Sequence, residues 1–141
     1  MFRLMQKFWN SDKEMLQDSD GKTYMVRKDY KQLVQRAERG NEHAQFEIVK
    51  LYNSDSGYVP EDLFKWTKHL ADIKKTEPLL IQLAELYEKG IGTKQNPSKA
   101  LNCYEMAYNI AASQCAYPPT PDEKEHLLSI RMLIKEVRKK I

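Results

Sequence analysis

The chain has 141 residues, 41% of them hydrophobic, and its 23 basic and 20 acidic residues leave a net charge of +3. This length and apolar share suit one folded domain and argue against disorder throughout. The near balance of charge argues against a dedicated nucleic-acid-binding protein, whose lysines and arginines must neutralise several phosphates. No apolar run approaches the roughly 20 residues that span a bilayer, and the first residues have neither the apolar core nor the small-residue cleavage site of a secretory signal.

The first nine residues predict a short amphipathic helix. Its apolar face consists of Phe2, Met5, Phe8 and Trp9. We interpret this face as a cap over the open end of a helical array, because acidic residues follow at once and the stretch is short for stable interfacial binding. Weak membrane association through Phe2, Phe8 and Trp9 is the alternative.

The segment up to residue 41 predicts a turn, a loop and one helix. Residues 18–21 (DSDG) are typical of a turn. Residues 23–26 are rich in strand formers, but no partner strand is evident, so we expect a loop. Asp29 is a plausible N-cap for a helix over residues 30–39, and Gly40 is a natural stop.

Apolar residues at helical spacing predict the remaining helices, over residues 42–53, 61–75, 77–89, 97–114 and 120–141. The last helix has the clearest start, with Thr120 as N-cap, Pro121 at the first helical position and Glu123 as the acid of a capping box. We interpret this helix as a terminal cap. Docking onto a partner, or onto a second copy of the chain, is the alternative.

Four of these helices form two successive pairs. Tyr52 corresponds to Tyr87 at an offset of 35 residues, and Trp66 corresponds to Cys103 at an offset of 37. A period in the mid-thirties with two helices per unit indicates an α-solenoid, because a single helix pair cannot bury its apolar face alone.

The two pairs resemble the Sel-like repeat family, which is related to the tetratricopeptide repeats. The family pattern runs roughly A-x-A-Q-x-x-L-G-x-x-Y-x-x-G-x-G-V and, after a polar link, K-A-x-x-W-Y-x-x-A-A. The matching residues are Ala44, Gln45, Leu51, Tyr52, Leu86, Tyr87, Gly90, Gly92, Lys99, Ala100, Tyr104 and Ala107. Thr93 and Cys103 stand in place of the family's valine and tryptophan, and the first repeat has largely lost its glycine loop.

The resemblance covers roughly residues 29–112 and implies an all-α fold. We expect a short right-handed α/α solenoid of helix-turn-helix repeats with capping helices at both ends. The whole chain would form one domain. Its parts would be an N-terminal cap with a degenerate repeat (1–41), two repeats (42–76 and 77–114) and a C-terminal capping helix (120–141).

No catalytic or metal-binding pattern is found in the sequence. His43, His69 and His126 are 26 and 57 residues apart and Cys-x-x-Cys is absent, so we expect no metal site and no cofactor. Cys103 stands where the family carries a packed tryptophan, so we expect a buried, inert thiol and no enzyme. A thiol-dependent enzyme that uses Cys103 or Cys115 is the less favoured alternative.

The two cysteines also bear on the compartment. Cys103 and Cys115 are 12 residues apart, which on one helix corresponds to about 18 Å, beyond the reach of a disulfide. Two free thiols suit a reducing environment, so we expect a cytoplasmic protein.

A chain without catalytic residues is expected to act through its surface. In helix-pair solenoids the first helix of each unit usually lines the concave side. The predicted protein-binding residues are the polar positions between core residues of those helices, namely Gln45, Glu47, Lys50, Gln82, Glu85 and Lys89. Tyr58 and Tyr117 lie in loops, either as exposed anchors for a partner or packed back onto their own helices.

We therefore predict a non-catalytic adaptor or regulator that binds one protein partner, such as a signalling or secretion component, with no nucleic acid and no stable membrane insertion. The alternative is an immunity protein that neutralises a cognate toxin by direct binding. Nothing in the sequence separates these two uses.

Overall fold

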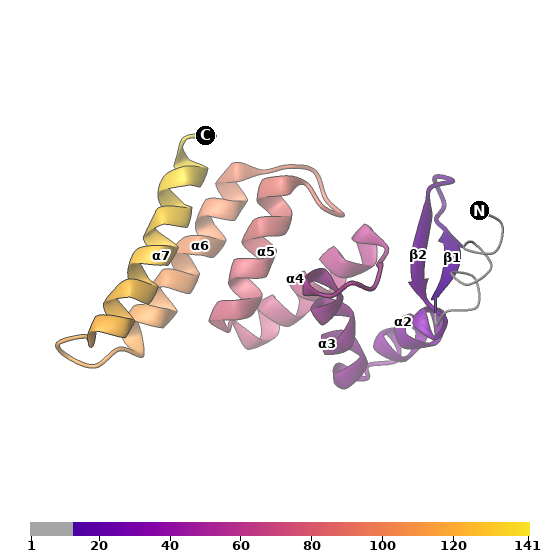
Figure 1. Ribbon diagram of the computed structural model, residues 1–141, viewed down its shortest axis with the longest axis horizontal. Coiled ribbons are helices and arrows are strands. Elements are labelled where there is room, and N and C mark those ends of the chain that lie inside the picture. Colours follow the sequence, from indigo (N-terminus) through magenta and orange to yellow (C-terminus); the bar gives the residue numbers. More distant parts are fainter. Residues whose placement is uncertain (1–12) are drawn as a thin grey trace, which may run out of the picture. The chain divides into compact units, whose positions relative to one another are not determined.

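The protein is mostly helical. A computed structural model describes residues 13–141 (Figure 1), and the helix expected over the first nine residues lies outside this range. The elements, in chain order, are β1 (Lys13–Gln17), β2 (Thr23–Arg27), α2 (Tyr30–Glu38), α3 (Glu42–Lys50), the 3₁₀ turn η1 (Leu51–Asn53), α4 (Pro60–Lys74), α5 (Glu77–Lys89), α6 (Pro97–Ser113) and α7 (Pro121–Arg138). Every helix predicted within the described range is present, with ends within one turn of those expected.

The chain divides into two compact units, and each is described by itself. The boundary lies between Trp66 and Thr67, inside α4. The first unit holds the two strands, α2, α3, η1 and the start of α4. The second holds the rest of α4 together with α5, α6 and α7.

A β-hairpin in the first unit corrects the all-α expectation. β1 and β2 pair antiparallel, so the loop predicted over residues 23–26 is wrong. The predicted turn joins the two strands. In that turn, Oδ1 of Asp18 accepts the backbone N–H groups of Asp20 and Lys22, each at 2.9 Å. Gly21 supplies the positive φ of 83° that the turn requires.

Tyr30 occupies the centre of the core of the first unit, with 1% of its surface exposed. The buried cluster around it consists of Val26, Tyr30, Leu51 and Val59. The Tyr30 hydroxyl accepts the backbone N–H of Val59 at 3.0 Å and donates to Oδ2 of Asp62 at 2.7 Å. Tyr58 packs against this cluster, so of the two interpretations of Tyr58 the structure supports the one in which it folds back onto its own unit.

The loop between η1 and α4 passes close to β2 at Gly57. Gly57 forms a single parallel bridge with Val26. A Cβ atom added at Gly57 would lie 1.7 Å from the carbonyl oxygen of Met25, so only glycine allows this approach.

The start of α2 differs from the expectation, whereas the start of α3 shows an ordinary cap. Asp29 makes no side-chain capping bond. Its carboxylate accepts instead the Nε and Nη2 groups of Arg27, at 2.8 and 2.6 Å. The side chain of Asn41 accepts the backbone N–H of Ala44 and so caps α3.

The second unit consists of helices that pack in sequence, α5 on α6 and α6 on α7 (Figure 1). Gly90 ends α5 in the left-handed conformation, with φ of 72°. Asn96 caps α6 just before Pro97. The predicted capping box of Thr120 and Glu123 starts α7. The ends of the helices on either side of α6 therefore have local chemical causes in the sequence.

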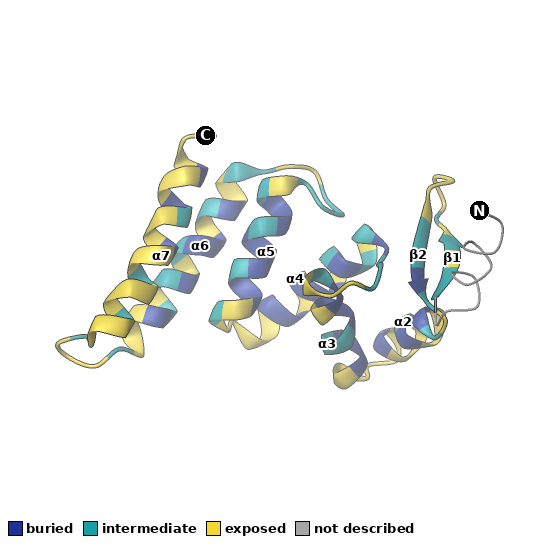
Figure 2. Ribbon diagram, viewed as in Figure 1, coloured by how far each residue is buried: buried dark blue, intermediate teal, exposed yellow. Residues whose placement is uncertain are grey.

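The helices of the second unit bury their apolar stripes against one another (Figure 2). The buried residues of α5 include Leu79, Leu80, Leu83, Ala84, Leu86 and Tyr87. Ala100, Cys103, Tyr104, Ala107 and Ala111 are buried on α6, and Ile130, Ile134 and Val137 on α7. Alanines dominate the α6 stripe, which lets its neighbours approach closely from both sides.

Two side-chain contacts show the direction of α7 relative to α5. His126, near the start of α7, pairs with Glu77 at the start of α5. Lys140, just after α7, pairs with Glu88 near the end of α5 at 2.8 Å. Both pairs can form only if α5 and α7 run in the same direction. The paired side chains reach across one side of α6, the helix between them.

The two tyrosines that correspond in the sequence differ in burial, which predicts different costs of removal. Tyr87 is 6% exposed and lies under the Lys99 ammonium, 5.6 Å from the ring centre. Tyr52 is half-buried in η1. Tyr87→Ala should cost about 3–5 kcal/mol and Tyr52→Ala roughly half as much, because the cost follows the surface that the ring buries. Urea denaturation followed by circular dichroism measures the unfolding free energy of each variant. Equal losses in the two variants would contradict this prediction.

Candidate functional site

The two glutamines of the predicted binding surface are buried. Gln45 is 5% exposed, and its Nε2 donates to the carbonyl oxygen of Ala37 on α2 at 3.0 Å. Gln82 is 9% exposed, and its Nε2 donates to Oγ1 of Thr67 on α4 at 3.1 Å. Each amide therefore joins a helix to the preceding one and is turned away from solvent.

The other two predicted residues of the first unit lie at the surface of α3. Lys50 is exposed and Glu47 is half-exposed. Glu47 lies between the Arg27 guanidinium at 3.7 Å and the His43 imidazole at 3.1 Å. Because Glu47 already has these two partners within the chain, it is a weaker candidate than Lys50 for contact with a partner.

In the second unit, Glu85 and Lys89 follow each other along one face of α5. Ile81, one turn earlier, completes a stripe at four-residue spacing, in which Ile81 and Glu85 are half-exposed and Lys89 is exposed. Ile81 was not predicted as part of the site, since an isoleucine beside an apolar stripe is normally assigned to the core. The combination of one aliphatic and two opposite charges is chemically suited to contact with protein.

The end of α5 carries a linked carboxylate. Glu88 accepts the hydroxyl of Tyr104 at 2.9 Å and the ammonium of Lys140 at 2.8 Å, so one side chain connects α5, α6 and the end of α7. Burial by itself would raise the pKa of Glu88, but the bonds from Lys140 and Tyr104 outweigh it and lower the pKa below its usual value.

This lowered pKa predicts a pH-dependent contribution to stability. A carboxyl group whose pKa is lower in the folded state than in the unfolded state stabilises the fold. Its contribution is complete at pH values above the unfolded-state pKa and is lost as the pH falls through the folded-state pKa. Glu88→Gln should therefore cost about 1 kcal/mol at pH 7 and progressively less below pH 4. Thermal unfolding at several pH values tests this. Glu85→Gln, which removes a carboxylate without an ion pair within residues 13–141, is the control and should show no such trend.

The two cysteines are free, and their surroundings work against the thiolate form. Cys103 is buried in α6, and burial raises the pKa of its thiol to about 11. Cys115 lies just after α6, where its Sγ donates to the carbonyl oxygen of Ala111 at 3.2 Å. Burial and the nearby carboxylates of Glu123 and Glu77 raise the pKa of Cys115 as well.

A pocket of about 290 Å³ does place Cys115 near an imidazole. Its lining comprises Glu77, Ala111, Gln114, Cys115, Asp122, Glu123 and His126. The His126 ring is paired with Glu77, and the carboxylate of Glu123 accepts the backbone N–H groups of Ala116 and Thr120. Three acids around one thiol oppose its ionisation, so the pocket lacks the positive surroundings of a nucleophilic cysteine.

These environments predict slow thiol chemistry. At pH 7.5 Cys115 should react with an alkylating reagent more slowly than free cysteine, because its thiolate fraction is reduced. Cys103 should react only after the second unit unfolds, since its side chain is buried. Timed alkylation read by mass spectrometry measures both rates, with Cys115→Ser isolating Cys103. A thiol that reacts faster than free cysteine would restore the thiol-dependent enzyme as a candidate.

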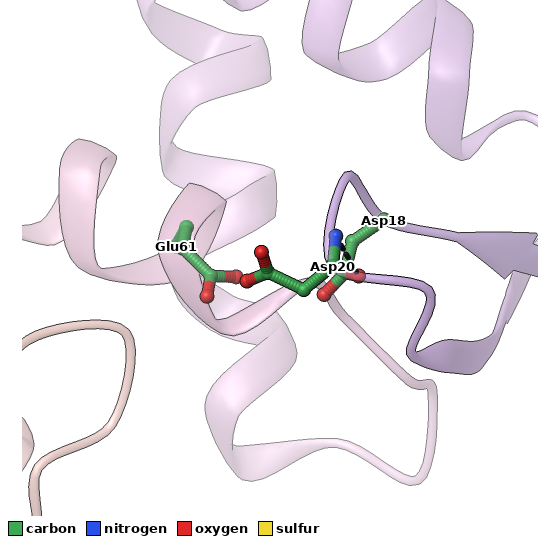
Figure 3. A group of neighbouring side chains, drawn as sticks. All are labelled: Asp18, Asp20 and Glu61. Carbon is green, nitrogen blue, oxygen red and sulfur yellow. Dashed lines mark hydrogen bonds between the residues drawn. The ribbon is translucent and has the colours of Figure 1, made fainter.

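An acidic group lies beside the hairpin turn in the first unit. Asp18, Asp20 and Glu61 each bring one carboxylate oxygen within 4.8 Å of the others (Figure 3). Both oxygens of Asp18 already accept hydrogen bonds, Oδ1 in the turn and Oδ2 from the Tyr24 hydroxyl at 3.1 Å. The turn explains the position of Asp18, and we assign no metal to the group.

Tyr117, the second loop tyrosine, is fully exposed between α6 and α7. Its position agrees with the interpretation as an exposed anchor, while its role in binding stays a prediction. No helix among residues 13–141 is long and apolar enough to cross a membrane. The aromatic residues considered for weak membrane association lie outside that range.

Comparison of the chain with family models, with curated proteins and with solved structures found no match.

Proposed function

We propose that the protein is a non-catalytic protein-binding module built from Sel-like helix pairs, arranged as a short right-handed α-solenoid. The proposal is supported by the shared direction of α5 and α7, the two neighbours of α6, which the pairs Glu77–His126 and Glu88–Lys140 define. Helix-pair repeats have this geometry, since equivalent helices of successive repeats stack in parallel. The buried glutamines add support, because the first helix of each proposed pair is tied to the helix before it.

The observation that carries the binding role is the surface stripe of α5. Ile81, Glu85 and Lys89 follow one another at its surface. The Glu85 carboxylate makes no ion pair or side-chain hydrogen bond within the described part of the chain that would explain it as structural. In the first unit, Lys50 with Glu47 forms a smaller surface of the same kind. One partner protein would bind to the α5 stripe.

The surroundings of Cys103 and Cys115 favour a binding role over a catalytic one, because they raise the pKa of both thiols and so reduce the thiolate fraction that nucleophilic catalysis needs. Two uses of a binding module remain open. In the first the protein is an adaptor or regulator of a signalling or secretion component. In the second it is an immunity protein that neutralises a toxin.

The experiment is an affinity capture from the native organism with the tagged full chain, quantified by mass spectrometry, followed by titration of the purified partner. We expect one stoichiometric partner. Combined Ile81→Ser, Glu85→Ala and Lys89→Ala should weaken its binding at least ~10-fold, as for a contact surface with one apolar anchor. Lys31→Ala with Gln35→Ala, two exposed changes on α2, is the matched control and should bind as wild type.

Each outcome has a definite meaning. A partner whose enzymatic or toxic activity is lost on binding favours the immunity protein, and a partner that keeps its activity favours the adaptor. Equal binding by the α5 variant and the wild type would remove the α5 stripe as the site. Failure to capture any partner, with both variants folded, would contradict the proposal itself.

A further inference from the structure

The outer face of α7 carries exposed apolar residues in the middle of the helix, between its acidic start and its basic end. Leu128 is 56% exposed and Met132 is 60% exposed. They are four residues apart and therefore neighbours on one face of the helix. The buried face, with Ile130, Ile134 and Val137, is the one that packs on α6, and α7 is otherwise largely exposed in Figure 2.

These two residues belong to a longer exposed stripe. The stripe consists of Pro121, Glu125, Leu128, Met132, Lys135 and Lys139, all exposed. The spacings alternate between four and three residues, which is the period of a coiled-coil seam. The stripe is symmetric about residue 130, because Leu128 and Met132 are equally distant from it, as are Glu125 and Lys135.

We propose that α7 pairs antiparallel with α7 of a second copy of this chain. In that arrangement Leu128 of one copy meets Met132 of the other, and Glu125 meets Lys135 in the next layer on each side. Residues 122–125 carry three acids and one lysine, whereas residues 135–140 carry four basic residues and one acid. The acidic start of each helix therefore lies along the basic end of its partner, and the helix dipoles are also opposed.

The charges of Glu125 and Lys135, which would meet across the interface, are available for this pairing. The ion pairs of α7 and the residues after it involve His126, Glu136, Arg138, Lys139 and Lys140. Neither Glu125 nor Lys135 takes part in an ion pair within residues 13–141. A second copy would give each of them a partner of opposite sign.

The pairing is expected to be weak. An 18-residue helix is about 27 Å long, and one such contact buries less than the roughly 1,200 Å² of a standard stable interface. Lys124 and Arg131 would also face their like-charged counterparts along one edge. We therefore expect a dissociation constant on the order of 100 μM, and a dimer that high salt weakens.

The test is analytical ultracentrifugation of the full chain from about 10 μM to 1 mM in low salt. The wild type should move from monomer to dimer over this range. Leu128→Ser with Met132→Ser should stay monomeric with an unchanged circular dichroism spectrum, because both side chains are exposed. Exposed Ile73→Ser on α4 is the matched control and should dimerise as wild type.

Charge reversal tests the antiparallel register directly. Glu125→Lys places two lysine pairs in the interface, and Lys135→Glu places two glutamate pairs there, so each variant alone should associate at least ~10-fold more weakly. An equal mixture of the two variants restores both opposite-charge contacts and should dimerise within about threefold of wild type. The double variant Glu125→Lys with Lys135→Glu should also recover.

Several results would overturn the proposal. They are a wild type that stays monomeric at 1 mM, a dimer that persists in the Leu128/Met132 variant, and single reversals that weaken the dimer without recovery on mixing. A monomeric wild type would leave the face to a partner of different sequence. The dimer is independent of the α5 surface, so the Ile81, Glu85 and Lys89 changes should leave it intact.

Discussion

Replacement of Tyr30 with alanine is expected to unfold the first unit. Tyr30 is 1% exposed and packs with Val26, Leu51 and Val59. Removal of a buried aromatic ring costs about 3–5 kcal/mol, and the loss of its hydroxyl partners adds about 1–3 kcal/mol. The sum is comparable with the whole stability of a small domain, about 5–15 kcal/mol. Loss of the dispersed NMR signals of the first unit is the measurement.

Tyr30→Phe separates the hydroxyl from the ring. This variant keeps the packing but leaves the buried N–H of Val59 and the carboxylate of Asp62 without the bonds that now satisfy them. We expect a cost of about 2 kcal/mol at pH 7. An unchanged stability would show that water or another group replaces the hydroxyl.

The cost of Tyr30→Phe should depend on pH. Burial raises the pKa of Asp62, and the bond from Tyr30 works in the opposite direction. A carboxyl group whose pKa is raised in the folded state stabilises the fold at pH values below its unfolded-state pKa. This contribution is lost as the pH rises through the folded-state pKa. Without the hydroxyl the pKa rises further, so Tyr30→Phe should cost more at pH 7 than at pH 4. A constant cost over that range would contradict this account.

Gly57→Ala is expected to destabilise the first unit by a backbone clash. The added Cβ would lie 1.7 Å from the carbonyl oxygen of Met25 and 2.8 Å from its carbonyl carbon. Both atoms belong to the backbone of β2, so no side-chain rotation relieves the clash. The bridge to Val26 must open. Such overpacking costs about 1–3 kcal/mol or more, and we expect the upper end.

Hydrogen exchange of the hairpin amides measures this effect, because opening the bridge should speed exchange in β2 before the rest of the unit. Gly40→Asn is the matched control. Gly40 has a φ of 94°, and a Cβ atom added there would have open space around it. Asparagine also tolerates positive φ better than most residues. This change should cost about 0.5 kcal/mol, and an equal cost at both glycines would contradict the clash.

The helices were predictable because their ends are encoded locally. Asn41, Asn96 and Thr120 cap the helices that follow them, and Gly90 terminates α5. Such signals act within four residues of chain, so the sequence alone suffices. Asp29 shows the limit of this inference. Its residue type suits a cap, but the nearby arginine at position 27 takes its carboxylate.

The hairpin was missed for a different reason. The strand formers of residues 23–26 and the turn before them are evident in the sequence. Their partner Lys13–Gln17 (KEMLQ) neither alternates polar and apolar residues nor contains a β-branched one. Strand pairing depends on what lies across the sheet. Here β2 is also bridged at Val26 by Gly57, which lies 31 residues further along the chain. A pattern local to either strand does not contain that information.

The candidate surface was predicted less well than the helices. Gln45 and Gln82 stand at the edge of an apolar stripe, where a long amide can turn toward solvent or toward a neighbouring helix. The choice is made by the acceptor that the neighbour offers, which is the Ala37 carbonyl for one and the Thr67 hydroxyl for the other. The other four residues, Glu47, Lys50, Glu85 and Lys89, are half-exposed or exposed.

The two buried glutamines also bear on how a chain with internally similar helices avoids pairing them incorrectly. Similar amphipathic helices can exchange neighbours or slip by one turn with little loss of apolar contact. A buried amide donor left without an acceptor is costly, so each glutamine penalises such mistakes. The two acceptors differ in kind, a backbone carbonyl in one case and a hydroxyl in the other. α3 and α5 are therefore not interchangeable, and each is expected to recognise only the helix that precedes it.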